Sequence, residues 1–150
     1  MKAYRYRFEN VLTYRELEKT ETEIEYQTAI EAFEVVATKL YDLLKKKEST
    51  ITAQQSQMSA GASVIEIHHY TRFIDSLEKQ IDRLQQEVIR ARSKMQWYEQ
   101  KLLERTMEVR KFEKMKEKDK IRYRNEQQAK EAQRLDELST MSFRGKENGW

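Results

Sequence analysis

Glu66, His68 and His69 stand together near the middle of the chain and carry side-chain types that bind metal ions. Neighbouring residues of an α-helix point about 100° apart, so the two histidines cannot readily share one ion, and the plainer interpretation is that they face solvent or a partner. The sequence also offers no Gly-rich phosphate loop and no evident pairing of a nucleophile with a base. We therefore predict no catalytic, cofactor or metal site, and expect a protein that is not an enzyme.

The composition indicates long helices rather than a compact globule. Of 150 residues, 37% are charged and 38% hydrophobic, which is too few apolar residues to fill a three-dimensional core of this size. Proline is absent and there are only three glycines, so the residues that interrupt helices are nearly missing. The chain is also too rich in aromatic residues for a disordered segment of such charge.

Charge and cysteine content narrow the function classes. The net charge is only +3, which argues against general binding of nucleic acid. The chain has no cysteine, so it has no disulfide framework and fits a reducing compartment. No stretch approaches the ~20 apolar residues that cross a bilayer, and the basic N-terminus is not followed by the apolar run of a secretory signal. A cytoplasmic protein is expected.

The second half of the chain carries a heptad seam, in which apolar residues recur at alternating steps of three and four. The series departs from apolar types only at Arg105, and its members are Ile67, Tyr70, Ile74, Leu77, Ile81, Leu84, Val88, Ala91, Met95, Tyr98, Leu102, Arg105, Val109 and Phe112. Such a narrow stripe, kept over several heptads, is typical of a left-handed coiled coil. This half of the chain is therefore predicted to pair with another helix.

A similar but less regular seam runs through the first half. It is apolar from Tyr26 to Leu43 and poor from Arg15 to Thr22. Between the two halves, Gly61 can adopt the left-handed conformation that ends a helix. Ser63 with Glu66 then matches the S-x-x-E capping box that begins one. A stop signal followed at once by a start signal predicts that the chain folds back on itself.

We therefore predict an all-α fold, a long two-helix antiparallel coiled-coil hairpin over residues 1–138. The first helix is expected over 4–58, the loop over 59–63 and the second helix over 64–138. The second helix outlasts the first, so it should overhang beyond about residue 115. Residues 139–150, which include two glycines, are expected to form a flexible tail.

Charge supports the antiparallel pairing. Folding about Gly61 places residue i roughly opposite residue 122 − i, which sets the glutamates of 16–34 against the basic residues of 90–105. The same register brings Arg15, Lys19 and Arg105 to one level of the seam. Either the register shifts there, or neighbouring glutamates such as Glu18 and Glu104 neutralise the layer. We predict that this layer is the least stable part of the paired region.

Two groups of side chains are candidates for partner binding. Large aromatic residues off the seam cannot be buried by a two-stranded coiled coil, and as a group they favour binding, although each one could equally cover a seam neighbour. They are Tyr4, Tyr6, Tyr41, Phe73 and Trp97. Basic residues cluster at 2–7 and 111–124, which the hairpin brings to its open end. They form either a solvated helix face or an electropositive tip that docks on an acidic protein surface.

Several stretches resemble the flagellar export protein FliJ, in forms from Bacillus-type bacteria. They occur in the family's order around one short loop and cover nearly the whole chain: YRFENVLTYRELE at 6–18, HYTRFIDSL at 69–77, EVRKFEKM at 108–115 and LDELS at 135–139. The resemblance implies a soluble component of the flagellar type III export apparatus. It also implies a coiled coil similar to the central stalk of rotary ATPases, without a cofactor.

The resemblance further implies three partners: the hexameric flagellar export ATPase, the cytoplasmic domain of the export gate, and export chaperones. The protein would be monomeric on its own and would reach the cytoplasmic face of the inner membrane through these partners. We expect contacts at the open tip, through Arg5, Arg7, Lys114, Lys118 and Arg122, and nearer the loop, through Tyr41, His69 and Phe73. The alternatives are a homodimeric coiled-coil scaffold unrelated to export and, against the charge balance, a nucleic-acid-associated helical protein.

Overall fold

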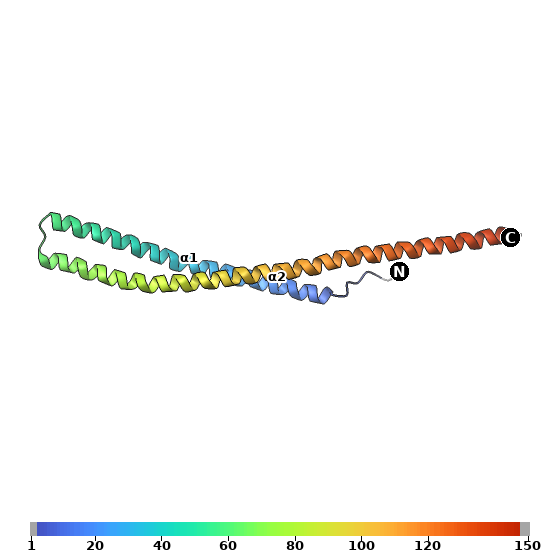
Figure 1. The fold of residues 1–150 in the computed structure, drawn as a ribbon, viewed down its shortest axis with the longest axis horizontal. Coiled ribbons are helices and arrows are strands. Elements are labelled where there is room, and N and C mark those ends of the chain that lie inside the picture. The colour runs from blue at the N-terminus through green and yellow to red at the C-terminus, as the bar shows by residue number, and fades with distance from the viewer. Residues whose placement is uncertain (1–2, 148–150) are drawn as a thin grey trace. The chain divides into compact units, whose positions relative to one another are not determined.

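Two long helices account for almost all of the fold. A computed structural model describes residues 3–147, and within them it contains α1 (Glu9–Ser59) and α2 (Val64–Glu147) and no strand. A short loop joins the helices, and α2 returns antiparallel to α1 (Figure 1). The predicted all-α fold, an antiparallel helical hairpin, is confirmed.

The packing divides the chain into two compact units. The loop unit comprises Thr20–Glu104, and the terminal unit comprises Met1–Lys19 with Arg105–Trp150. Within the loop unit the predicted seam is buried or half-buried at every position, and Leu77 is among its most deeply buried side chains. Lys47 Nζ lies 3.3 Å from Glu78 Oε1, and Gln54 Nε2 donates to Thr71 Oγ1 at 3.0 Å. These contacts join positions that folding about Gly61 was predicted to place opposite each other.

The loop is built as the local sequence predicts. Gly61 has a φ of 82°, the N–H of Ala62 donates to the carbonyl oxygen of Gln57, and the N–H of Gly61 donates to that of Met58. This pair of bonds is the Schellman motif, which satisfies carbonyl groups left free at the end of α1. The hydroxyl of Ser63 then accepts the N–H of Glu66 at 3.3 Å and caps the start of α2.

In the terminal unit, α1 begins at Glu9 and not at Tyr4. Residues 3–6 are not helical, and their side chains alternate: Tyr4 and Tyr6 face α2, whereas Arg5 and Arg7 are exposed. Tyr6 is only 8% exposed, and its hydroxyl donates to the carbonyl oxygen of Phe112 at 3.1 Å. A strand-like period of two places both tyrosines on one side, which a helix over these residues would not do. We call residues 3–8 the N-terminal strap.

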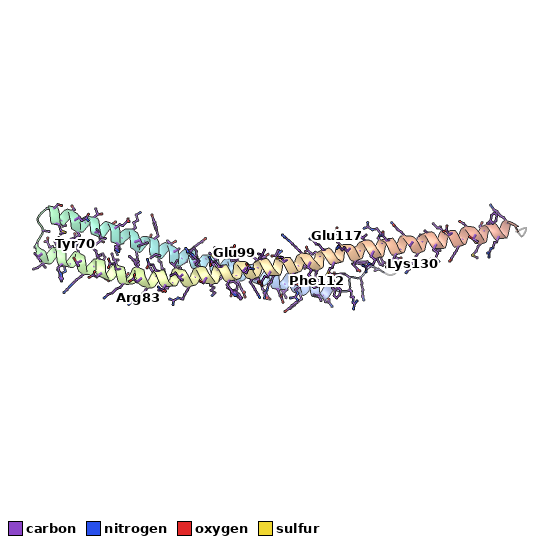
Figure 2. All side chains as sticks on the ribbon, in the orientation of Figure 1. Tyr70, Arg83, Glu99, Phe112, Glu117 and Lys130 are labelled. Carbon is purple, nitrogen blue, oxygen red and sulfur yellow. The ribbon has the colours of Figure 1, made fainter. Side chains whose placement is uncertain are left out.

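The strap lengthens the paired part of α2. Tyr4 packs against Tyr123 with 5.3 Å between ring centroids, so contacts continue past residue 115, where we expected the overhang to begin. From 124 to 146 nearly every residue is exposed, and Lys130 lies on this part of α2 (Figure 2). Residues 139–147 are helical and do not form the predicted tail, because local helix propensity outweighs the single Gly145. The last predicted tail residues, 148–150, lie outside the described residues.

The charged seam layer keeps its register. Arg15 and Arg105 are half-buried at seam positions of the terminal unit, and both turn towards Glu18. Arg15 reaches the Glu18 carboxylate at 3.3 Å, and Arg105 donates to the Glu18 carbonyl oxygen. Of the two alternatives, neutralisation is therefore the observed one, and Glu18 provides it. Glu104 instead lies 3.8 Å from Lys101.

Candidate partner-binding site

The strap positions the basic residues of the N-terminus. Because Tyr4 and Tyr6 are fixed against α2, the alternating residues Arg5 and Arg7 are held in solvent on the other side. Tyr4 Oη donates to Asp119 Oδ2 at 2.9 Å, which ties the strap to the helix. The guanidinium of Arg7 lies 5.4 Å from the ring centroid of Phe8. The tip thus presents its cations from an ordered segment.

The strap and α2 enclose two basic hollows. The first, of about 630 Å³, is lined by Tyr4, Arg5, Tyr6, Arg7, Glu9, Asn10, Lys116 and Lys120. The second, of about 290 Å³, is lined by Tyr6, Arg7, Phe8, Met115, Lys118, Asp119 and Arg122. The structure therefore gathers three predicted residues, Arg7, Lys118 and Arg122, around one hollow. Arg5 lies with Arg7 at the other, and Lys114 lines neither.

The tyrosines of the strap remain protonated donors at neutral pH. Burial, followed by the hydrogen bond to Asp119, raises the pKa of Tyr4 to about 12. Burial also raises the pKa of Tyr6, with a further contribution from the charge of Asp119. Each phenol keeps its proton and its bond to α2. For each off-seam aromatic residue the sequence left open packing within the protein or contact with a partner, and both strap tyrosines pack within the protein. The alternation of aromatic and basic residues from Tyr4 to Phe8 is the signal that could have placed them.

Near the loop, the structure brings together only part of the predicted set. His69 and Phe73 line one hollow of about 470 Å³ with Lys46, Ser49, Thr50, Ala53 and Tyr70. Phe73 is 43% exposed, and the ammonium of Lys46 lies 5.3 Å from its ring centroid. Tyr41 is exposed but does not line this hollow. Lys46 was missed; the antiparallel register, which sets residues near 50 opposite Phe73, could have pointed to it.

Within residues 3–147, no three or more His, Cys, Asp or Glu side chains gather in a group that could hold a metal ion. Neither α1 nor α2, over that same part of the chain, includes a stretch both long and apolar enough to cross a membrane.

The fold and the tip define a class of protein: a two-helix coiled-coil hairpin with an ordered, basic open end. Comparison with known proteins gives the family. The model of the family described as "Flagellar FliJ protein" matches residues 4–148, and the chain belongs to this family. It is 37% identical over 141 residues to the "Flagellar FliJ protein" of Bacillus subtilis (strain 168), covering 94% of this chain and 96% of that relative. No solved structure gives a significant match.

Proposed function

We propose that this member of the FliJ family acts in flagellar protein export as a non-catalytic, rotary-stalk-like coiled coil. Its terminal unit binds the ring of the flagellar export ATPase, and its loop unit binds the cytoplasmic domain of the export gate. Export chaperones are the third class of partner. The protein is cytoplasmic, and it reaches the membrane at the flagellar base through these partners. It couples ATP hydrolysis by the ATPase to the export gate and catalyses no reaction itself.

The observation that carries this proposal is the gathering of Arg7, Lys118 and Arg122 around one hollow of the terminal unit. Lys118 and Arg122 are one helical turn apart on α2, and the hairpin and the strap bring the distant Arg7 beside them. A basic end of this kind suits an acidic surface inside a protein ring, since complementary charge guides docking and fixes its register. The intramolecular seam also leaves the hairpin as a self-contained body that needs no second copy.

The hollow near the loop supports a separate contact. Phe73 offers an exposed aromatic ring beside Lys46 and His69, and aromatic anchors with a basic neighbour are frequent centres of protein–protein binding. We assign this surface to the gate. Replacing Phe73 by Ala should weaken recovery of the gate's cytoplasmic domain and leave recovery of the ATPase unchanged. The reverse pattern would contradict the assignment.

A cellular experiment tests the function as a whole. The gene is deleted in the organism that encodes this chain, and flagellar proteins released into the medium are quantified. We expect their export to fall and to be restored by the wild-type protein. Restoration by the triple variant Arg7→Glu/Lys118→Glu/Arg122→Glu should be poor although the protein accumulates normally. Undiminished export in the deletion strain would contradict a role in export.

A further inference from the structure

The outer face of α2 in the terminal unit carries a stripe of cations and methionines. Its residues are exposed and follow helical spacing, and two of them, Met115 and Lys118, also border the second hollow beside the strap. We call it the outer stripe, and its members are Met107, Arg110, Lys111, Lys114, Met115 and Lys118. All six are exposed, whereas Val109, on the seam side of the same helix, is buried. The six side chains line a hollow of about 530 Å³.

The charge of the outer stripe has one sign. Four of its six residues are cationic and none is acidic, although the chain as a whole is nearly balanced at +3. Glu113 and Glu117 belong to the same part of α2, but neither lines this hollow. A surface of one sign with low net charge elsewhere selects an acidic partner rather than any charged one.

The two methionines of the outer stripe indicate that its partner also carries apolar side chains. Met107 is 61% exposed and Met115 37% exposed, and eight residues of helix set them about 12 Å apart. Methionine is flexible and polarisable, so it adapts to apolar side chains of varied shape. A partner helix that runs along α2 meets this spacing with apolar residues placed seven or eight positions apart.

We infer that the outer stripe binds an acidic, amphipathic helix of a partner protein. Its carboxylates would face the four cations of the stripe, and its apolar side chains would cover Met107 and Met115. An anionic membrane fits less well, because membrane-surface helices present a continuous apolar face with Trp, Phe or Leu. Single-stranded nucleic acid fits less well, because the stripe offers no aromatic ring for stacking. The inference deepens the proposed function and rests on it, since Lys118 lines both the outer stripe and the hollow that carries that proposal.

A designed peptide tests the inference with the full chain. The probe is a fluorescent helical peptide with Leu at two positions seven residues apart and Glu at the intervening exposed positions. Its control is a scrambled peptide of the same composition. Fluorescence anisotropy should show binding of the designed peptide and weaker binding of the scrambled one. No binding at about 1 mM peptide, or equal binding of the two peptides, would overturn the inference.

Three variants locate the binding. Lys111→Glu/Lys114→Glu/Lys118→Glu should lower the affinity at least about tenfold, and Met107→Ser/Met115→Ser about threefold or more at unchanged charge. The matched control, Lys79→Glu/Lys94→Glu/Lys130→Glu, makes the same charge change at exposed sites off the stripe and should leave binding near the wild-type value. Equal losses in the stripe and control triples would show binding by net charge alone and overturn the inference.

Two further probes test the class of partner. They are vesicles of phosphatidylglycerol and phosphatidylcholine, and a single-stranded oligonucleotide. The inferred partner would be wrong on one pattern of results. In it, Lys111→Glu/Lys114→Glu/Lys118→Glu loses binding to the vesicles or to the oligonucleotide, while the designed peptide binds the wild type and every variant equally. The two proposals can fail separately. If the peptide binds but the protein does not bind the ATPase, only the assignment of the ATPase is contradicted. If the protein binds the ATPase but not the peptide, only the acidic-helix inference is contradicted.

Discussion

The guanidinium of Arg105 donates a 3.3 Å hydrogen bond to the backbone carbonyl oxygen of Glu18, and its Nε lies 3.9 Å from the carboxylate of the same residue. Arg15 approaches that carboxylate from its own helix at 3.3 Å. Arg15 and Arg105 thus occupy seam positions that are mostly apolar elsewhere, and Glu18 contacts both of them. The Nε atom of Arg15 is buried without a hydrogen-bond partner, which adds to the cost of the layer.

Removing the compensating charge should weaken the hairpin. Glu18→Gln removes the carboxylate that both half-buried guanidinium groups approach, and we expect it to lower the free energy of unfolding by about 1–2 kcal/mol at neutral pH. Urea unfolding followed by circular dichroism measures the change. The matched control is Glu21→Gln, which removes the same charge at an exposed site of α1 and should cost less than about 0.5 kcal/mol.

The same carboxylate predicts how that difference depends on pH. The hydrogen bond from Tyr14 and the pairing with Arg15 lower the pKa of Glu18 although partial burial opposes them. A lowered pKa in the folded state means that the contribution is present above the pKa of an unfolded glutamate, about 4.3, and is lost as the pH falls below it. The wild type and Glu18→Gln should therefore converge in stability in acid. A gap that persists would contradict a charge-based role.

The strap should be released by ionising Tyr4. Because the pKa of Tyr4 is raised to about 12, its contribution is intact below about pH 10 and is lost as the pH rises towards 12. Asp119→Asn should lower the pKa of Tyr4, since the carboxylate both accepts the hydrogen bond of the phenol and repels the phenolate. Nuclear magnetic resonance of the tyrosine rings resolves the titration. Tyr41→Phe serves as the control, and unchanged titration of Tyr4 in Asp119→Asn would contradict the contact.

Gly61 should be required by its backbone conformation. Its φ is +82°, and a methyl group added there would meet nothing within 4 Å. Gly61→Ala should therefore destabilise the protein through backbone strain and not through a steric clash with a neighbour. We expect a loss of about 1–2 kcal/mol in urea unfolding. The same substitution at Gly145, inside α2, should not destabilise the protein. Equal effects at both positions would show that the left-handed turn is not fixed.

The protein should be monomeric, since each helix finds its seam partner within the chain. Light scattering should give a mass close to 18.2 kDa at all concentrations. A mass of twice that value would favour the homodimeric scaffold, in which the seams pair between copies.

The sequence predicts correctly those features of the fold that depend on residues close together in the chain. The alternation from Ile67 to Phe112 and the signals at Gly61 and Ser63 lie in a few neighbouring residues, and the seam and loop follow from them. The start of α1 was misplaced because the strap depends on distant groups, the Phe112 carbonyl and the Asp119 carboxylate. Residues 139–147 were predicted to be a flexible tail because of two glycines, but they are helical. The prediction gave too little weight to the good helix formers in this stretch.

The candidate site also combines local features, which the sequence predicts, with long-range contacts, which it does not. Clusters of basic residues can be seen in the sequence, but which of them lie together in space cannot. Arg7 joins Lys118 and Arg122 only because an extended strap turns alternate side chains outward, and a helix there would have distributed them differently. Near the loop, Phe73 was named from its position off the seam. Lys46 was not named. The antiparallel register points to residues near 50 as neighbours of Phe73, but the approach of the Lys46 ammonium to the ring also depends on its side-chain conformation.

The most direct test of the account measures binding to the flagellar export ATPase of the organism that encodes this chain. Purified full-length protein is sedimented with the assembled ATPase, and the wild type is compared with Arg7→Glu/Lys118→Glu/Arg122→Glu. We predict that the wild type co-sediments and that the variant binds at least about tenfold more weakly while keeping its helical content. Equal binding of both proteins, or no binding of the wild type, would contradict the assignment of the terminal unit to the ATPase.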